Sequence, residues 1–361
     1  MTDEEYMALA LKQALRGVGK VDPNPLVGAV IVKDGKIIGR GAHERYGSLH
    51  AERNALAVCE EDPRDATLYV TLEPCCHWGK TPPCTDAVFD SGIARVVVGS
   101  GDPNPLVAGG GVRLLRERGV EVTEGVLKGE CDELNAVFFH YICTKTPFCI
   151  LKYAMTMDGK TATCTGASKW VTGVAARERV QADRNRYAAI MIGVGTVLAD
   201  DPLLTCRLPD SRSPVRVVCD THLKTPLTSQ LVRTARDVPT ILATCETDGE
   251  RALPYCGEGC EVLTLPERDG RVDLSALTAA LGARGLSSLI IEGGGTLAAS
   301  ALEAGIVDRV QAYIAPKLFG GAAAKTPVMG AGIETPSEAY RLSPPRVTLL
   351  GDDLLLESEV L

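Results

Sequence analysis

The start of the chain has the apolar spacing of an amphipathic helix followed by a β-hairpin. Thr2 and Glu5 have the spacing of a capping box, which marks a helix start. Apolar residues then recur on one helical face, at Met7, Ala10, Leu11, Ala14 and Leu15. Two apolar runs, Leu26–Val32 and Lys36–Gly41, flank Asp34-Gly35, a dipeptide that favours a tight turn. We therefore expect a helix and then two antiparallel strands.

From residue 50 to residue 143 the pattern alternates between helical and strand-like segments. Helices are predicted over Ala51–Cys59, from about Cys84, over Val112–Arg118 and as one long element over Cys131–Cys143. Apolar runs predict strands at Ala66–Leu72, Ala94–Gly99 and Val120–Val126. A mixed sheet flanked by helices is the most economical packing for this order.

The run Thr144-Lys-Thr-Pro147 breaks the last of these helices and leads into an apolar strand, Phe148–Met155. This pattern predicts two α/β domains, residues 1–145 and residues 146–361. Near the end of the second, Ser287–Glu292 enters Gly293–Gly295 before a predicted helix, Thr296–Leu302. Three glycines at such a turn can hold a phosphate at the helix N-terminus. Alternatively, the glycines only allow a tight connection between strand and helix. The spacing G-x-G-x-x-G is missing, so a nicotinamide site here implies a fold other than Rossmann.

The most informative chemistry is the combination of His50-Ala51-Glu52 with Pro74-Cys75 and Cys84. It offers three zinc ligands, His50, Cys75 and Cys84, which leave the fourth position open as in a catalytic site. Glu52 is a carboxylate that is not a ligand, and it fits the general acid and base role of the glutamate in H-x-E…P-C-x-x-C nucleobase deaminases. Because residues i and i+2 of a helix point in nearly opposite directions, His50 is expected at a helix start. We predict one Zn²⁺ per chain.

The spacing departs from the short motif, since eight residues separate Cys75 from Cys84. Cys76 and His77 are rival ligands, and Cys75 is favoured because it directly follows Pro74. In the alternative without a metal site, these cysteines are small hydrophobic residues buried in the core.

Composition narrows the function classes. The 361 residues carry a formal charge of −8 and only 4% aromatic residues, unlike a nucleic-acid-binding surface. No apolar run has the length of a membrane span, so neither nucleic acid nor membrane is an expected partner. Thirteen cysteines without an export signal favour a cytoplasmic protein with free thiols. We expect a small-molecule substrate.

One hexapeptide occurs twice, as Asp22–Val27 and Asp102–Val107. Asp-Pro and Asn-Pro are ordinary turn chemistry. In the functional alternative, Asn24, Asp102 and Asn104 present amide and carboxylate groups to a polar ring or sugar.

Together these residues resemble one family, the bifunctional deaminase/reductases of bacterial riboflavin biosynthesis. The resemblance rests on Pro23–Gly28, His43, His50–Glu52, Thr71–Cys84 and Gly101–Pro105, and it continues through the second half. It implies a cytidine-deaminase-like N-terminal domain and a dihydrofolate-reductase-like C-terminal domain. The Thr71–Cys84 segment is similar to the family's long-loop zinc motif, which explains the unusual spacing.

For the first domain, the resemblance implies hydrolytic deamination of 2,5-diamino-6-ribosylamino-4(3H)-pyrimidinone 5′-phosphate, with Glu52 as the catalytic residue. The matching positions expected to bind the substrate are Asn24, His43, His77, Lys80, Asp102 and Asn104.

For the second domain, it implies NADPH-dependent reduction of the ribosyl group to ribityl. The motifs are Leu151–Lys160, Ser168–Thr172, Gly195–Leu204 and Glu292–Gly295. Expected NADPH contacts are Ala154, Trp170, Thr196, Asp200, Thr221, Gly294, Gly295, Thr296, Leu297, Ala298, Ala299 and Ser300. Expected substrate contacts are Lys152, Ser168, Arg184, Leu204, Arg207 and Glu292.

Two other functions compete with this one. The first is a nucleic-acid deaminase, such as a tRNA editor, with an accessory domain. The second is a non-catalytic zinc-stabilised binding protein in which Cys76 or His77 closes the metal site. For the protein itself, the apolar faces and the short linker lead us to expect a homo-oligomer.

Overall fold

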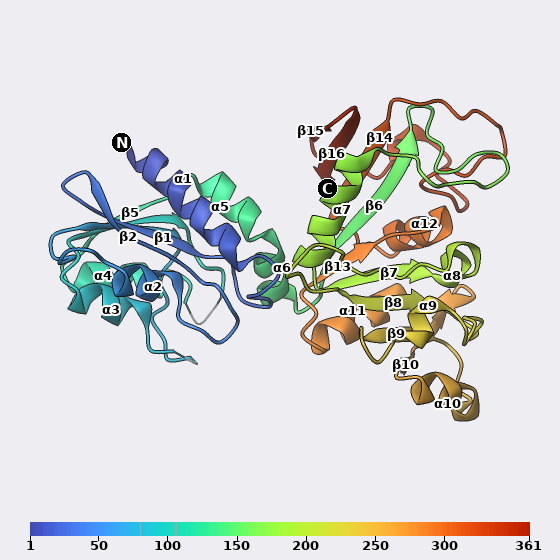
Figure 1. Ribbon diagram of the computed structural model, residues 1–361, viewed down its shortest axis with the longest axis horizontal. Coiled ribbons are helices and arrows are strands. Elements are labelled where there is room, and N and C mark those ends of the chain that lie inside the picture. The colour runs from blue at the N-terminus through green and yellow to red at the C-terminus, as the bar shows by residue number, and fades with distance from the viewer. Residues whose placement is uncertain (80, 105–106) are drawn as a thin grey trace. The chain divides into compact units, whose positions relative to one another are not determined.

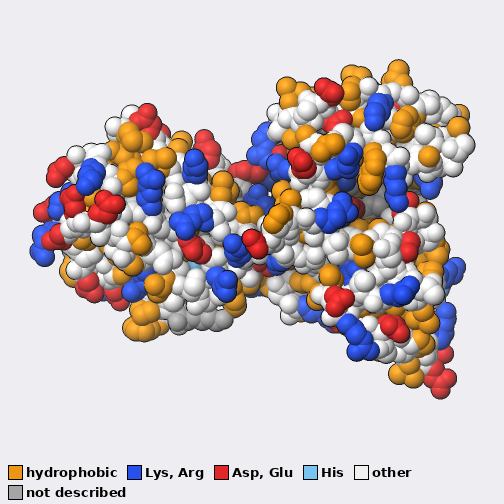
Figure 2. Space-filling model, in the orientation of Figure 1, with side chains coloured by type: hydrophobic (Ala, Val, Ile, Leu, Met, Phe, Trp, Pro, Cys, Tyr) orange, Lys and Arg blue, Asp and Glu red, His pale blue; other side chains and the backbone are white. Residues whose placement is uncertain are grey.

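The computed structural model describes residues 1–79, 81–104 and 107–361 (Figure 1). The chain forms two compact units, Met1–Lys145 and Thr146–Leu361. Within the described residues, no helix combines the length and the apolar character that crossing a membrane requires. On the face of each unit seen in Figure 2, acidic and basic side chains are interspersed.

The first unit alternates helices and strands from its N-terminus. In chain order its elements are α1 (Asp3–Ala14), η1 (Leu15–Gly17), β1 (Gly28–Lys33), β2 (Lys36–Ala42), α2 (Ala51–Ala57), β3 (Thr67–Leu72), α3 (Cys84–Asp90), β4 (Arg95–Ser100), α4 (Gly110–Glu117), β5 (Glu121–Glu124), α5 (Lys128–Leu134) and α6 (Ala136–Thr144). The predicted capping box is confirmed, because Thr2 and Glu5 bond reciprocally at the start of α1. The predicted hairpin is β1 and β2.

The sheet of this unit is mixed, as the order of elements predicts. Its strand order is β2-β1-β3-β4-β5, with β1 antiparallel to both neighbours and β3, β4 and β5 parallel. Side chains of a strand alternate between the two faces of the sheet, so neighbouring residues of β1 pack in two different hydrophobic cores. Ala29 and Ile31 pack in the core with α2, α3 and α4, whereas Val30 and Val32 pack in the core with α1. Figure 1 shows α1 and α5 on one face and α2, α3 and α4 on the other.

The single long helix predicted over Cys131–Cys143 is wrong, because α5 and α6 are separate helices that meet at Asn135. The backbone of Asn135 leaves helical geometry, at φ −109° and ψ 16°. Its buried side chain bonds to the backbone of Leu26 instead. The asparagine side chain competes for hydrogen bonds with backbone N–H and C=O groups and can interrupt a helix for that reason. The apolar periodicity of the sequence does not indicate this break.

The second unit is built on a larger sheet. Its elements are β6 (Phe148–Thr156), α7 (Val174–Arg186), β7 (Ala189–Gly193), α8 (Val194–Asp200), β8 (Val215–Cys219), α9 (Gln230–Arg233), β9 (Thr240–Thr244), α10 (Gly249–Gly257), β10 (Glu261–Thr264), β11 (Glu267–Arg268), β12 (Arg271–Val272), α11 (Leu274–Ala283), β13 (Ser288–Ile291), α12 (Gly295–Glu303), β14 (Arg309–Ala315), η2 (Pro336–Glu338), β15 (Arg346–Leu350) and β16 (Asp353–Glu359).

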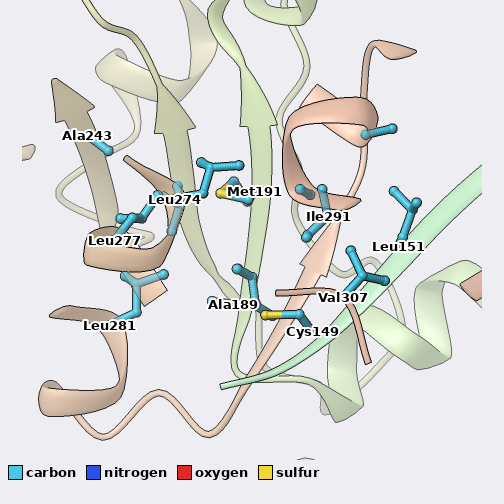
Figure 3. Packing of buried hydrophobic residues seen from close by; sticks show 14 of the residues in the cluster. Cys149, Leu151, Ala189, Met191, Ala243, Leu274, Leu277, Leu281, Ile291 and Val307 are labelled. Atoms are coloured by element: carbon cyan, nitrogen blue, oxygen red, sulfur yellow. The ribbon is translucent and has the colours of Figure 1, made fainter. Parts of the chain in front are cut away.

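Nine of these strands form one sheet, in the order β10-β9-β8-β7-β13-β6-β14-β16-β15. The strands from β10 to β14 are parallel, and the hairpin of β15 and β16 adds two antiparallel strands at one edge. Leu274, Leu277 and Leu281 of α11 pack on the sheet beside Met191 and Ala243 (Figure 3). This core fixes the ends of β6, β7 and β13, around which the predicted site residues Lys152 and Glu292 lie.

Candidate active sites

The three predicted zinc ligands come together in the first unit, each at a junction between elements. His50 is the N-cap of α2, Cys75 follows β3, and Cys84 is the first residue of α3. His50 Nδ1 lies 3.6 Å from the Cys75 sulfur and 3.4 Å from the Cys84 sulfur. All three ligand atoms lie within 4.8 Å of one another. The prediction that His50 begins a helix is confirmed.

The electrostatics of the cluster suit a divalent metal. The thiol of Cys84 and then the His50 ring stabilise the Cys75 thiolate, which lowers the pKa of Cys75 to about 4. The same contact with Cys75, together with burial, raises the pKa of Cys84. One imidazole nitrogen and two sulfurs are the donor set that zinc prefers when a fourth position stays open. This donor set is the zinc-binding site of the chain.

The rival ligands lie outside this cluster. Across the described part of the chain, His50, Cys75 and Cys84 are the one set of His, Cys, Asp or Glu side chains close enough to share a metal. The Cys76 sulfur lies toward α4, where it is 3.0 Å from the Cβ position of Gly110. His77 keeps Nδ1 buried without a hydrogen-bond partner. The choice of Cys75 over its neighbours is therefore correct.

Glu52 lies in the first turn of α2, two residues after His50, and is only 3% exposed. Burial raises the pKa of its carboxyl group above the usual value, and the negative charge on Cys75 adds to this effect. A buried carboxyl group with a raised pKa can both accept and donate a proton near neutral pH. Glu52 therefore has the electrostatic environment of a general acid and base.

His43 and Asn24 lie beside the metal ligands. The His43 ring packs edge-on against the His50 ring, with centroids 5.3 Å apart. Its Nδ1 faces the Leu49 carbonyl at 3.1 Å and its Nε2 faces Asn24 Nδ2 at 3.2 Å. Because a carbonyl only accepts, Nδ1 carries the proton and Nε2 accepts from Asn24. Burial lowers the pKa of His43, which keeps this ring neutral.

Asp102 and Asn104 lie in the loop after β4. Asp102 Oδ1 accepts the backbone N–H of Asn104 at 2.8 Å. Burial raises the pKa of Asp102 to about 6, and the hydrogen bond from the Asn104 N–H and the nearby His77 ring oppose this shift, so His77 and Asp102 lie near each other. Lys80, the other predicted substrate contact of this unit, lies outside the described residues.

Thr81 is a neighbour of the metal site that the sequence pattern does not single out. Its hydroxyl lies 3.5 Å from His50 Nε2, the ring nitrogen opposite the sulfurs. Metal-binding histidines usually donate their second N–H to such a group, which fixes the ring. Its position in the loop between the ligands Cys75 and Cys84 is the feature of the sequence from which this contact could have been predicted.

The second unit contains a pocket of about 510 Å³ where most of its predicted site residues meet. Ten of them line it: Lys152, Ala154, Ser168, Trp170, Arg184, Thr196, Asp200, Leu204, Arg207 and Glu292. These side chains come from segments between residues 152 and 292, which the sheet brings together.

A buried charge cluster lies in this pocket. Glu292 pairs with Arg184 at 3.2 Å and with Lys152 at 3.8 Å. Burial alone would raise the pKa of Glu292, but Lys152 and Arg184 overcome it and hold the pKa below the usual value. Glu292 is therefore ionised at neutral pH and neutralises part of the positive charge of the two cations.

The remaining predicted cofactor residues lie outside the pocket lining. Thr221 follows β8 and accepts the Thr244 hydroxyl through its carbonyl. Residues 294–300 run from the N-cap of α12 into that helix. Gly295 must lack a side chain, because a Cβ would lie 2.8 Å from the Thr326 carbonyl. The Ser300 hydroxyl accepts a hydrogen bond from Arg271 at 2.8 Å.

Arg177 and Gln181 also line the pocket, although the sequence reasoning missed them. The Arg177 guanidinium lies 4.9 Å from the centre of the Trp170 ring. The Gln181 side chain accepts the backbone N–H of Arg207 at 2.8 Å. Together with Arg184 they occupy positions i, i+4 and i+7 of α7, one face of the helix. Arg177 and Gln181 could have been predicted from this helical spacing relative to Arg184.

Comparisons with known proteins cover both units. Residues 1–100 match the family described as the cytidine and deoxycytidylate deaminase zinc-binding region, and residues 147–356 match the RibD C-terminal domain. The riboflavin biosynthesis protein RibD of Actinobacillus pleuropneumoniae is 54% identical over 361 residues, which cover 100% of this chain and 96% of that protein. RibD of Escherichia coli K12 is 40% identical, with 99% of each chain covered.

Solved structures agree with these matches. The Thermotoga maritima diaminohydroxyphosphoribosylaminopyrimidine deaminase/5-amino-6-(5-phosphoribosylamino)uracil reductase superposes with a TM-score of 0.86 at 37% identity, with 99% of each chain covered. Acinetobacter baumannii RibD gives a TM-score of 0.87 at 35% identity, also over 99% of each chain. The fold is thus a zinc-binding deaminase domain followed by a dihydrofolate-reductase-like domain, and neither a nucleic-acid deaminase nor a non-catalytic zinc protein accounts for both. The chain belongs to the RibD family of bifunctional deaminase/reductases of riboflavin biosynthesis.

Proposed function

We propose that residues 1–145 deaminate 2,5-diamino-6-ribosylamino-4(3H)-pyrimidinone 5′-phosphate and that residues 146–361 then reduce its ribosyl group with NADPH. The observation that carries the proposal is the cluster of His50, Cys75 and Cys84 beside the buried carboxyl group of Glu52. The 510 Å³ pocket with its paired Lys152, Arg184 and Glu292 supports the second half.

For the deaminase step, His50, Cys75 and Cys84 would hold the zinc ion. Zinc supplies Lewis-acid activation of water at neutral pH. Glu52 takes a proton from the attacking water and returns it to the leaving amine, a cycle that its raised pKa suits. The neutral His43 and Asn24 lie on one side of this centre, and we assign them to the pyrimidine ring.

The remaining substrate contacts of the deaminase are assigned to polar groups of the loops after β3 and β4. His77 has an unpartnered buried ring nitrogen, and Asp102 has a partly buried carboxyl group in the same region. Asn104 follows Asp102 in the same turn. These groups can donate to and accept from a diaminopyrimidine. Lys80 keeps its assignment from the sequence alone.

In the reductase step, NADPH supplies the hydride and the pocket orients the two reactants. We assign Ser168, Leu204, Arg184 and Arg207 to the phosphorylated sugar, because guanidinium groups bind phosphate in bidentate fashion. Lys152 is a residue of β6 and Glu292 directly follows β13, where Glu292 pairs with Lys152 and with Arg184. Trp170, Ala154, Thr196 and Asp200 line the side assigned to NADPH.

The other NADPH assignments lie at element ends. The backbone N–H groups at the start of α12 suit an anionic pyrophosphate, and we assign residues 294–300 to the cofactor on this basis. Thr221 is assigned to the same cofactor.

We also infer a cytoplasmic homo-oligomer. None of the thirteen cysteines forms a disulfide, which is the state that a reducing compartment maintains. Exposed apolar side chains on the edge strand β15, Val347 at 56% and Leu349 at 73%, support association between copies.

The test supplies the purified, zinc-loaded protein with the diaminopyrimidine ribosylamine phosphate and NADPH, and follows ammonia and NADPH together. Ammonia release followed by NADPH consumption is the expected result. Ammonia without NADPH consumption would limit the proposal to the first unit. If neither changes, both assigned reactions are wrong.

A further inference from the structure

Glu73 is a buried carboxylate that the deaminase chemistry described so far does not use. It follows β3 directly and is 5% exposed. Its two oxygens accept four backbone N–H groups. Oε2 accepts from Asp102 at 3.3 Å and Gly109 at 3.0 Å, and Oε1 accepts from Gly111 at 2.9 Å and Val112 at 3.1 Å. No ion pair to Glu73 is formed within the described residues.

These donors come from both ends of one segment, the loop after β4 and the first turn of α4. The N-cap of α4, Gly109, offers no side chain to the first N–H groups of the helix. Glu73 satisfies them from another strand, and its charge is favourable at a helix N-terminus. The same carboxylate thereby fixes Asp102, whose own side chain orders Asn104.

Glu73 also belongs to the backbone that carries a zinc ligand. Pro74 and Cys75 follow it directly, and α4 approaches this stretch so closely that a Cβ on Gly111 would lie 2.0 Å from the Pro74 carbonyl oxygen. The positions of Cys75 and of the Asp102 loop are therefore set by one short segment of chain. A charged acceptor makes this connection stiffer than a neutral one, because its hydrogen bonds are shorter and stronger.

We propose that Glu73 is a positioning residue of the deaminase, which places Asp102 and Asn104 at the correct distance from the metal site for pyrimidine binding. The proposal rests on the proposed substrate contacts of these two residues. A carboxylate that only caps a helix would affect stability alone. A positioning residue changes substrate binding in the folded, metal-loaded enzyme.

The test is the substitution Glu73→Gln, which keeps the size of the side chain. The amide NH₂ group turns one acceptor into a donor that faces N–H groups, so about half of the bonds are lost. We expect the deaminase KM to rise about tenfold or more with kcat within about threefold of the wild-type value. Zinc content by metal analysis and reductase activity on the deaminated intermediate should be unchanged.

Asp132→Asn is the matched control. The Asp132 carboxylate accepts the Ser100 hydroxyl at 2.5 Å, at the end of the neighbouring strand, but no N–H of the Asp102 loop. Its deaminase KM should equal that of the wild type. A wild-type KM for E73Q, or a loss confined to kcat or accompanied by loss of zinc, would overturn the proposal.

Asp102→Ala separates this proposal from the proposed function. If Glu73 acts through Asp102, the double variant has a KM no higher than D102A alone. A wild-type KM in D102A refutes the substrate role of Asp102, whereas a raised KM in D102A with a wild-type KM in E73Q refutes the role of Glu73. If E73Q does not fold, Glu73→Asp takes its place. It keeps the charge but shortens the reach, so a KM raised several-fold with full zinc content is expected, and a wild-type KM contradicts the proposal.

Discussion

The side chain of Asn135 binds both backbone groups of Leu26, a residue 109 positions away in the chain. Asn135 Oδ1 accepts the Leu26 N–H at 2.8 Å, and Asn135 Nδ2 donates to the Leu26 carbonyl at 3.0 Å. This pair joins the break between α5 and α6 to the first copy of the hexapeptide, which carries Asn24. It fixes the entry into β1 beside the metal site.

Asn135→Ala should therefore destabilise the first unit by about 2 kcal/mol, because it leaves a partly buried N–H and a partly buried carbonyl of Leu26 without these partners. Urea unfolding followed by loss of deaminase activity measures this change. Reductase activity should persist to the wild-type urea concentration. A change in unfolding free energy below about 0.5 kcal/mol, the usual range for surface positions, contradicts the assigned role.

Glu52→Gln should abolish deamination and leave NADPH oxidation on the already deaminated intermediate intact. Loss of a general acid and base costs about 10²- to 10⁴-fold in rate. Zinc content should stay at one ion per chain, because Glu52 is no ligand. Simultaneous loss of both activities would show that the two sites are not separate.

Removal of zinc by a chelator should abolish deamination and expose Cys75 to thiol reagents. Its pKa of about 4 makes it a thiolate at pH 6, whereas the buried Cys84 has a raised pKa. Alkylation at pH 6 followed by mass spectrometry should label Cys75 before Cys84 and before the exposed Cys143 and Cys164. Zinc should protect both ligands. Labelling of Cys84 at the same rate as Cys75, or no protection by zinc, would contradict the assignment.

Arg207→Ala should weaken the reductase alone. A hydrogen bond to a charged group contributes about 1.5–3 kcal/mol, so the KM for the phosphorylated intermediate should rise about tenfold to a hundredfold. Gln181→Ala, which frees the Arg207 backbone N–H but keeps the guanidinium, should give a smaller rise. An unchanged KM in Arg207→Ala rules out phosphate binding by this residue.

The ion pair of Asp3 with Arg95 should make stability depend on pH. Hydrogen bonds from Arg95, at 2.7 Å and 3.1 Å, and from the Tyr69 hydroxyl lower the pKa of Asp3 below its usual value. A carboxyl group with a depressed folded-state pKa stabilises the protein fully above its unfolded pKa, about 3.9, and this contribution is lost as the pH falls through the folded pKa.

Asp3→Asn should accordingly cost about 1–2 kcal/mol of unfolding free energy at pH 7, after allowance for partial exposure, and progressively less below pH 4. Chemical denaturation of both proteins in the same buffers measures the difference. The exposed pair of Lys36 and Glu61 provides the control, because solvent screens this pair and Glu61→Gln should leave the unfolding free energy unchanged within experimental error. A difference for Asp3→Asn that is independent of pH would refute the charge-based explanation.

The local pattern of residues was sufficient to predict most helices and strands of the first unit. The capping box of Thr2 and Glu5, the hairpin at Asp34-Gly35 and the junction of His50 with its helix all depend on neighbours in the chain. The prediction of one continuous helix through Asn135 was wrong, because the break in the helix depends on a residue that is distant in the chain. Its break is stabilised by Leu26, and no window of neighbouring residues contains that contact.

The chemistry could be predicted from residue identity and short spacing, because these define the ligand types, the separate carboxylate Glu52 and the glycine-rich turn at Gly293–Gly295. The tertiary structure settled the choice between Cys75, which the sequence favoured, and its rival Cys76, because the Cys76 sulfur lies toward α4 and outside the cluster with His50. It also decided which side chains support the sites. Glu73, Gln181 and Asn135 act on backbone groups between 26 and 109 positions away, and such pairs are fixed by the packing of whole sheets and helices.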